Sequence, residues 1–331
     1  KRSHFNKLLL DRIGEALQAG SQAILFQNRR GFSPYVECGH CGWTANCPDC
    51  NVSLTYHKSD GSLRCHYCGY RIPVPAVCPS CGTGSLLPRG FGTEKIEQEL
   101  AAIFPEAAID RLDADTSQSA GGYRRIVEAF EQGRTDILIG TQIVTKGFDF
   151  GGVSLVGILN ADNLLNYPDF RAGERAFQLM TQVGGRAGRR SEPGTVVIQT
   201  AQPQHPVIEQ VLRGDYGAMV RSQLAERRAF FYPPYCRLIA VVMRHRDKEL
   251  LWRAAGAFAG SAREVFGRRL LGPEAPPVDR IRGRFLVRFL LKIERRSPSA
   301  EAKRLLQELF DRLHARTEFR SVEVAADVDP M

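Results

Sequence analysis

Eight of the nine cysteines form four Cys-x-x-Cys pairs within one short segment of the chain. The pairs are Cys38/Cys41, Cys47/Cys50, Cys65/Cys68 and Cys78/Cys81. Two residues between ligands let a tight turn point both sulfurs at one tetrahedral metal ion, so four pairs can supply two sites of four thiolates. The sequence therefore predicts two zinc ions, each held by four cysteines.

Two other uses of clustered cysteines fit this chain less well. Disulfide frameworks are typical of small secreted domains, whereas 331 residues are enough to bury a core without cross-links. Iron–sulfur clusters usually have differently spaced cysteines. The spacing favours a nested arrangement, in which the inner pairs share one zinc and Cys38/Cys41 shares the other with Cys78/Cys81. A sequential arrangement, in which neighbouring pairs share a metal, stays open.

The cysteine segment interrupts an alternating series of helices and strands. An amphipathic helix at 5–19 and a buried strand at 23–26 are predicted before it. After it we expect helices at 93–103, 123–131 and 171–183, and strands at 107–112, 136–139, 155–160 and 195–200. Such alternation predicts an α/β domain built on a doubly wound parallel sheet.

The pattern changes beyond residues 201–206. The elements expected there are helices at 207–212, 216–227, 248–266 and 300–315, and strands at 238–243, 284–292 and 321–325. Their order indicates a small α+β domain. We therefore expect three parts: an α/β domain at 1–37 and 84–213, a zinc-binding insertion at 38–83, and an α+β domain at 214–331.

The positive charge of the chain is concentrated in its last third. Residues 215–331 contain 23 basic and 15 acidic residues, against 22 and 21 in the rest. A basic surface favours a polyanion because neutralised phosphates release condensed counterions. On charge alone, a solvated basic face that maintains solubility explains the excess equally well. With no apolar run near the roughly 20 residues of a membrane helix and no signal peptide, we expect a cytoplasmic protein without a membrane partner.

Four glycine-containing segments of the α/β domain lie at predicted strand ends, where open sheets bind ligands. They are residues 27–31, 90–95, 140–149 and 182–189. The second and third lead from glycine towards a helix start, so backbone N–H groups and a threonine hydroxyl could hold a phosphate oxygen. Taken singly, each also fits an ordinary turn or helix cap. In the fourth, Arg186 and Arg189 lie on one face and can direct two guanidinium groups at one phosphoryl group.

The fourth segment resembles the sixth motif of superfamily 2 helicases. It reads Gln-x-x-Gly-Arg-x-Gly-Arg from Gln182, and residues 140–150 are similar to the fifth motif of the same proteins. Over essentially the whole chain, the sequence resembles the primosomal protein N′ family of replication-restart helicases. That resemblance rests on the position of the cysteine segment between 28–31 and 90–95, and on Tyr232-Pro-Pro-Tyr235, Arg280-Ile-Arg-Gly-Arg284 and Asp327-Val-Asp-Pro330.

The resemblance implies an ATP-dependent 3′→5′ DNA helicase that recognises stalled or branched forks and initiates primosome assembly for replication restart. The implied fold is a RecA-like second helicase lobe with an inserted two-zinc module and an α+β C-terminal domain. The resemblance also favours the nested zinc pairing. Besides two Zn²⁺, the implied cofactors are ATP and Mg²⁺ in the full-length enzyme. The implied partners are branched and single-stranded DNA, the single-strand binding protein, and primosome and helicase-loader proteins.

Roles for individual residues also come from the resemblance. Arg186 and Arg189 would act as arginine fingers that complete an ATP site lined by Gly147, Asp149 and Gln182. Contacts to the DNA backbone, or the positioning of those contacts, would fall to Arg29, Arg30, Thr93, Lys95 and Thr141.

Two motifs that hold phosphate and magnesium in the first motor lobe of such helicases are absent from this sequence. It contains neither a Gly-x-x-x-x-Gly-Lys-Ser/Thr loop nor an Asp-Glu-x-His segment. We therefore expect a fragment without ATPase activity of its own, and the lack of an initiating Met agrees with this. The alternative is a zinc-dependent DNA-binding or protein-docking module without motor activity, which would not require the Arg186/Arg189 pair.

Overall fold

The computed structural model divides the chain into two compact units. One unit contains Lys1–Ser33 and Gly90–Leu224, and the other contains Pro34–Arg89 and Ala225–Met331. The predicted division into three parts stays a prediction. The residues that the structure describes are 4–27, 35–38, 40–41, 43, 45, 48, 54–57, 60–64, 70–84, 86–89, 93–113, 116, 120–141, 150–165, 170–188, 193–200, 203–276, 279–295 and 299–330.

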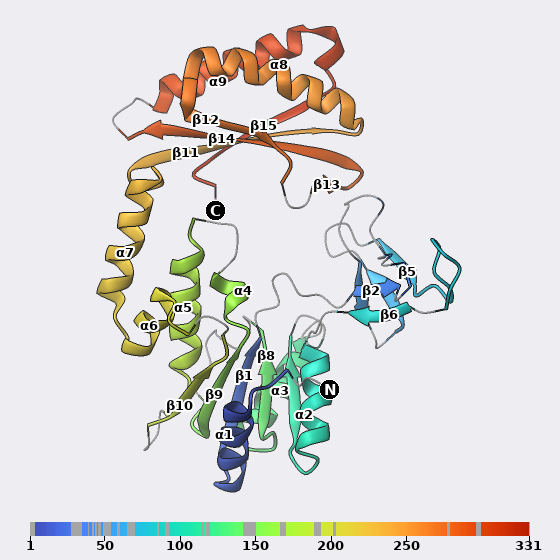
Figure 1. Cartoon of the computed structure of the whole chain (residues 1–331), viewed down its shortest axis with the longest axis vertical. Coiled ribbons are helices and arrows are strands. Elements are labelled where there is room, and N and C mark those ends of the chain that lie inside the picture. Colours follow the sequence, from blue (N-terminus) through green and yellow to red (C-terminus); the bar gives the residue numbers. More distant parts are fainter. Residues whose placement is uncertain are drawn as a thin grey trace. The chain divides into compact units, whose positions relative to one another are not determined.

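A five-stranded parallel sheet forms the centre of the first unit (Figure 1). Its strands in spatial order are β10 (Thr195–Ile198), β9 (Val153–Leu159), β1 (Gln22–Gln27), β8 (Ile137–Gly140) and β7 (Ile109–Leu112). All four neighbouring pairs are parallel. The chain starts in the middle at β1, adds β7 and β8 on one side, and then adds β9 and β10 on the other. The predicted doubly wound α/β sheet is confirmed.

Helices cover both faces of this sheet, so its central strand is buried on both sides. On one face, α1 (Lys7–Gln18) and α2 (Thr93–Ile103) pack against Ala23 and Leu25. On the other face, α3 (Ala120–Glu131) and α5 (Ala172–Gly184) surround Ile24 and Phe26. Alternating side chains of a strand point to opposite faces, so β1 reads as a continuous apolar run. The other helices of this unit are α4 (Asp162–Leu165), α6 (Pro206–Arg213) and the start of α7 (Tyr216–Ala229).

The second unit contains an antiparallel sheet with two helices packed on one face (Figure 1). Its strands in spatial order are β12 (Leu270–Glu274), β14 (Arg284–Glu294), β11 (Cys236–His245) and β15 (Glu323–Val328), with β13 (Arg280–Ile281) paired to β14. The helices α8 (Lys248–Phe266) and α9 (Ser299–Ala315) contribute to a core that includes Phe258, Phe289 and Phe310. The predicted α+β arrangement is confirmed for this part of the chain.

The cysteine segment adds two small sheets to the second unit. One pairs β2 (Tyr35–Cys38) with β6 (Leu86–Arg89). The other joins β3 (Thr55–His57), β4 (Ser62–Arg64) and β5 (Arg71–Pro73). Among the described residues of this segment, the buried apolar side chains are Val36, Ala45, Leu54 and Leu63, with aromatic and aliphatic side chains packed around them. In the described part of the chain, no helix has the length and apolar character needed to cross a membrane.

Candidate functional site

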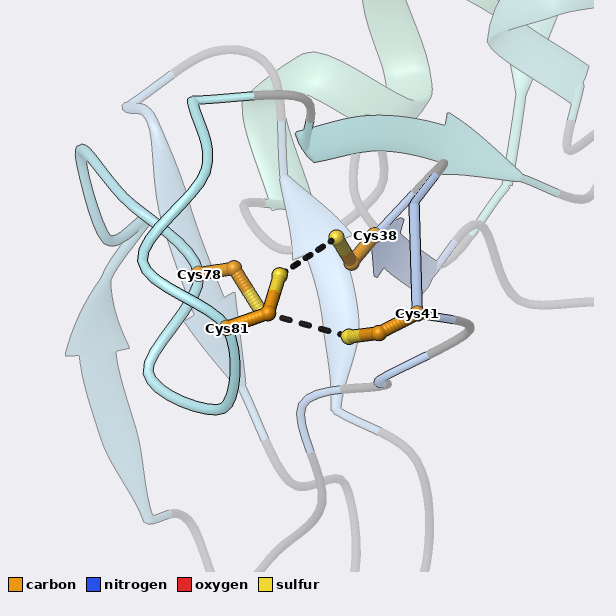
Figure 2. A group of neighbouring side chains, drawn as sticks. All are labelled: Cys38, Cys41, Cys78 and Cys81. Atoms are coloured by element: carbon orange, nitrogen blue, oxygen red, sulfur yellow. Dashed lines mark hydrogen bonds between the residues drawn. The ribbon is translucent and has the colours of Figure 1, made fainter.

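Four of the paired cysteines bring their sulfur atoms to one place (Figure 2). The Sγ atoms of Cys38, Cys41, Cys78 and Cys81 all lie within 4.8 Å of one another. Cys38 Sγ is 3.6 Å from Cys81 Sγ, and Cys41 Sγ is 3.7 Å from Cys78 Sγ, without a disulfide among the four. Tetrahedral zinc with bonds of about 2.3 Å holds its sulfurs about 3.8 Å apart. The donor set therefore fits one Zn²⁺, and it joins the first pair to the last, as in the nested arrangement.

Two similar turns present these four sulfurs. The backbone N–H of Cys38 donates to the carbonyl of Trp43, and that of Cys78 donates to the carbonyl of Thr83, both at 2.7 Å. Each bond spans five residues and closes a turn around one Cys-x-x-Cys pair. In the second turn Gly82 has a φ of +74°, which glycine adopts without steric cost.

The hydroxyl of Thr83 lies between two of the ligand sulfurs. Its oxygen is 3.4 Å from Cys38 Sγ and 3.3 Å from Cys81 Sγ. Hydrogen bonds, the largest contribution coming from Thr83 and others from backbone N–H groups, lower the pKa of Cys38 to about 6, and the Thr83 hydroxyl is also the main cause of a lowered pKa at Cys81. For Cys41 the backbone of Trp43 lowers the pKa, but burial and the neighbouring thiols outweigh it and raise the pKa to about 11. Because thiolate is the form that binds metal, Thr83 favours metal binding at its two neighbours.

The other four cysteines, Cys47, Cys50, Cys65 and Cys68, lie outside the described residues, so a second zinc site stays a prediction. Strands β3, β4 and β5, which lie between and after these cysteine pairs in the sequence, form a small sheet in which Asp60 accepts hydrogen bonds from Arg64 and Arg71. It also accepts the N–H and hydroxyl of Ser62. The sequence analysis missed Asp60. The Asp60-Gly61 pair between two strand-like runs, a common hairpin turn, was the signal that could have found it.

Three of the predicted DNA contacts lie where strands of the parallel sheet end. Thr141 directly follows β8, while Thr93 and Lys95 open α2, the helix beside β7. Thr93 and Thr141 are buried, at 2% and 7% exposure, whereas Lys95 is exposed. Arg29 and Arg30, which follow β1 in the sequence, lie outside the described residues. We call this side of the sheet, where its strands reach their C-terminal ends, the carboxyl edge.

A buried polar network fixes the start of α2 at the carboxyl edge. Thr93 donates its hydroxyl hydrogen to the carboxylate of Asp113, a fully buried residue directly after β7. Arg111 Nε lies 3.4 Å from this carboxylate and 3.6 Å from that of Glu97, whose pKa is raised mainly by burial. The sequence analysis missed Asp113, because one acidic residue after a strand carries no signal of its partner. Thr93 therefore positions α2 through its hydroxyl, and Lys95 is the exposed cation at this helix start.

Gln182 and Arg186 lie at the opposite side of the sheet, which we call the amino edge. Both belong to the C-terminal end of α5 and the turn after it. The N–H of Gly188 donates to the carbonyl of Val153, the first residue of β9, at 3.0 Å. The helix thus returns the chain to the amino ends of the strands. Of the two ends of the strands, this segment therefore lies at the amino end, because a helix after a parallel strand runs back along it.

The remaining predicted nucleotide-binding residues, Gly147, Asp149 and Arg189, lie outside the described residues. Phe150 is described and buried, and its ring meets Phe130 edge-on with 4.8 Å between centroids. Two residues later, the carbonyl of Gly152 accepts the N–H of Gln22 at the start of β1. Gly152 therefore lies at the amino edge, the edge on which Gln182 and Arg186 lie.

Family comparisons agree with this arrangement of modules. The PriA DNA helicase Cys-rich region (CRR) domain matches residues 47–73, the helicase conserved C-terminal domain matches 92–191, and the primosomal protein N C-terminal domain matches 228–331. The first match contains the four cysteines outside the described residues. The second contains the parallel strands β7 to β9 and most of the site residues of the sheet.

Curated relatives match over nearly all of the chain. The replication restart protein PriA of Bacillus subtilis is 38% identical over 99% of this chain and 41% of its own length. The Treponema pallidum protein is 41% identical over 98% of this chain and 48% of its own length. The Synechocystis protein is 40% identical over 88% of this chain and 36% of its own length. The chain thus spans less than half the length of these relatives. It belongs to the PriA family of replication restart proteins, with a RecA-like helicase C-terminal lobe and a cysteine-rich region.

Proposed function

We propose that this chain is the second motor lobe, zinc module and C-terminal domain of an ATP-dependent 3′→5′ DNA helicase. The whole enzyme would recognise stalled or branched forks and initiate primosome assembly. The observation that carries the proposal is the separation of the predicted site residues. Lys95 and Thr141 lie at the carboxyl edge of the parallel sheet, and Gln182 and Arg186 lie at its amino edge. One packed sheet can therefore transmit a movement from a nucleotide to DNA.

At the amino edge, Arg186 and Arg189 would stabilise the negative charge of the phosphoryl group being transferred. Gly147, Asp149 and Gln182 would line the same site. The phosphate loop and the Mg²⁺ site belong to the other motor lobe, so ATP turnover requires the full-length enzyme. On its own, this chain would not hydrolyse ATP.

At the carboxyl edge, Lys95 and the backbone at the start of α2 would bind a DNA phosphate, helped by Arg29, Arg30 and Thr141. The excess of basic residues in 215–331 would add affinity for branched and single-stranded DNA through counterion release. The single-strand binding protein and the primosome and helicase-loader proteins would be its protein partners, in the cytoplasm.

The zinc module would hold two ions, each with four thiolates. Cys38, Cys41, Cys78 and Cys81 would hold one, which is supported by the sulfur separations, and Cys47, Cys50, Cys65 and Cys68 would hold the other. Both ions would be structural, because four thiolates leave no position open for a substrate.

The test of this function is ATP turnover with and without DNA. Full-length enzyme should hydrolyse ATP in response to DNA, Arg189→Ala should lower turnover by a factor of 10³ or more, and the 331-residue chain should have none. Arg125, exposed on α3, supplies the control variant Arg125→Ala, which should retain full turnover. Turnover by the chain alone that Arg189→Ala abolishes would contradict the proposal. Full-length enzyme that binds DNA and never hydrolyses ATP would favour the docking module.

A further inference from the structure

Two consecutive phenylalanines are exposed where α7 leads into β11 (Figure 1). Phe230 is 64% exposed and Phe231 is 36% exposed, whereas Phe258 and Phe289 of the same unit are buried in its core. Neither exposed ring contacts another aromatic ring or a cation in the part of the chain that the structure describes. Single exposed apolar residues are common on soluble proteins, but adjacent aromatic rings left in water need an explanation. The pair is therefore a candidate binding surface.

The backbone that carries the two rings is fixed by hydrogen bonds. The N–H groups of Phe230 and Phe231 both donate to carbonyls of α7. The Lys292 ammonium group donates to the carbonyl of Phe230 at 2.7 Å, and the Cys236 thiol donates to the carbonyl of Phe231 at 3.2 Å. Because the backbone is already ordered, a ligand that binds to the rings loses little free energy to the ordering of the protein.

Phe231 also has a backbone conformation that a bulky residue rarely adopts. Its φ is +53°, in the left-handed region. The next residue holds the chain in place. The N–H of Tyr232 donates to the carbonyl of Arg227 at 2.7 Å, and the Lys292 ammonium lies 3.9 Å from the centroid of the Tyr232 ring. Such strained residues persist where surrounding contacts impose them, and they are concentrated at binding and active sites.

Lys292 ties the pair to the face of the antiparallel sheet opposite α8 and α9. It lies in β14 and pairs with Leu238 of β11. The next residues along the two strands, Ile293 and Ile239, belong to the core that α8 and α9 cover. Because side chains alternate along a strand, Lys292 and Leu238 point to the opposite face. The two exposed rings are therefore anchored from the face that these helices leave uncovered.

The sequence around the pair is cationic. Residues 227–237 contain Arg227, Arg228 and Arg237 and no acidic residue. Arg228 and Arg237 are exposed, and neither guanidinium group has a partner among the described residues. Free cations beside exposed aromatic rings are typical of surfaces that bind single-stranded nucleic acid, in which bases stack on the rings and cations contact the phosphates.

The size of the aromatic surface also favours a nucleic acid over a protein partner. Stable protein interfaces bury about 800 Å² on each partner. Two aromatic side chains supply only roughly 300–500 Å², even when both are fully covered. A nucleobase, by contrast, needs the face of one ring, so each phenylalanine can bind a base by itself.

We propose that Phe230 and Phe231 stack on bases of single-stranded DNA, with Arg228 and Arg237 on the adjacent phosphates. This inference rests on the proposed function, because it requires DNA at the C-terminal part of the chain. That function assigns only ionic contacts to this part, which do not distinguish a single strand from a duplex. Stacking requires an unpaired base with a free face, so the pair gives this part of the chain a preference for single strands.

The test measures the affinity of the 331-residue chain for two labelled oligonucleotides by fluorescence anisotropy. One is oligo(dT), and the other is an abasic strand with the same number of phosphates. Phe230→Ala and Phe231→Ala should each bind oligo(dT) about tenfold more weakly and bind the abasic strand as the wild type does. Phe230→Trp, which keeps an aromatic face, should retain the affinity for oligo(dT).

Trp252 supplies the control, because it is an exposed aromatic residue on α8, on the other side of the sheet. Trp252→Ala should bind both oligonucleotides with wild-type affinity. Thermal unfolding of Phe230→Ala should match the wild type, because an exposed side chain contributes little packing. Phe230→Ala should also leave the slope of log Kd against log salt unchanged, whereas Arg237→Ala should reduce it by roughly 0.7.

The outcomes separate this assignment from the proposed function. Wild-type affinity for oligo(dT) in both alanine variants would overturn the assignment while the proposed function stands, and would favour a protein partner for the pair. Equal losses of affinity for oligo(dT) and the abasic strand would also overturn it, because the rings would then not act on bases. A wild-type chain that binds neither oligonucleotide would overturn the proposed function and this inference with it.

Discussion

The hydroxyl of Thr93 donates a hydrogen bond to the carboxylate of Asp113, which joins the first residue of α2 to the residue directly after β7. The two residues are far apart in the sequence, and both are buried. Arg111 lies against the same carboxylate, so its charge is compensated in the interior. The start of α2, with Lys95 exposed on it, is therefore held in a fixed place at the carboxyl edge.

Asp113→Ala should destabilise the first unit by about 3 kcal/mol, because it removes a buried charge partner from Arg111 and leaves the Thr93 hydroxyl without its acceptor. Urea unfolding measures the difference. Glu106→Ala changes an exposed acidic residue on the same unit and should stay within about 0.5 kcal/mol of the wild type. Equal stability of the two variants would show that the buried network contributes nothing.

Metal analysis should give two zinc ions per wild-type chain and one for Cys78→Ser, because the cluster at Cys78 loses a thiolate while the second set is unchanged. Cys236 provides the control, since it is buried in β11, away from the paired cysteines in the sequence. Cys236→Ser should retain both ions. One zinc in the wild type, or two in Cys78→Ser, would contradict the assignment.

Thr83→Val should weaken the same zinc site at mildly acidic pH. Thr83 is the largest of the hydrogen-bonding causes that lower the pKa of Cys38, so its removal should raise that pKa and let protons compete with the metal at a higher pH. Following zinc release while the pH is lowered should show the midpoint of the variant at higher pH than that of the wild type. Thr317→Val, in the short helix near the C-terminus, should not move the midpoint. Identical midpoints for Thr83→Val and wild type would show that the Thr83 hydroxyl does not affect zinc binding.

Asp247 should make the stability of the second unit depend on pH in the acidic range. Its carboxylate caps α8 by accepting the N–H of Leu250 at 3.0 Å, and this bond is the main cause of its lowered pKa. A pKa that is lower in the folded state than its unfolded value of about 3.9 stabilises the protein at pH values above about 3.9. This stabilisation is lost as the pH falls through the folded-state pKa. Asp247→Asn keeps a cap without a titrating group. The unfolding temperature of the variant should match the wild type at pH 7 and fall less steeply below about pH 4.

Much of the fold follows from the sequence because its signals are local. The apolar run at 23–26 lies within β1, and the periodic segment 248–266 coincides with α8, which has Asp247 as its cap and Gly267 after it. The strand β12 was missed. It contains Gly272 and Pro273, which argue against a strand, and its pairing with β14 shifts register at this point. β12 forms a strand because it pairs with β14, which the sequence alone does not show.

The candidate site was also predicted only in part from the sequence. The spacing of the cysteines carries the zinc chemistry, because the ligands of each turn are close in the sequence. The sequence did not show that the predicted site residues divide between two opposite edges of the parallel sheet. That division depends on the direction of α5, which is set by the whole βαβ unit. Asp113 was missed for a related reason: it is one polar residue at the end of an apolar strand, and its role comes from the neighbouring strand and helix.

The separation of the two edges is tested most directly by measuring DNA affinity and DNA-stimulated ATP turnover for Lys95→Ala and Arg186→Ala in the full-length enzyme. Lys95→Ala should weaken DNA binding and retain turnover at saturating DNA, because Lys95 is exposed at the start of α2. Arg186→Ala should abolish turnover and retain DNA affinity, because Arg186 follows α5 at the amino edge. If Arg186→Ala loses DNA affinity as Lys95→Ala does, or Lys95→Ala stops turnover at saturating DNA, the two edges do not have separate roles.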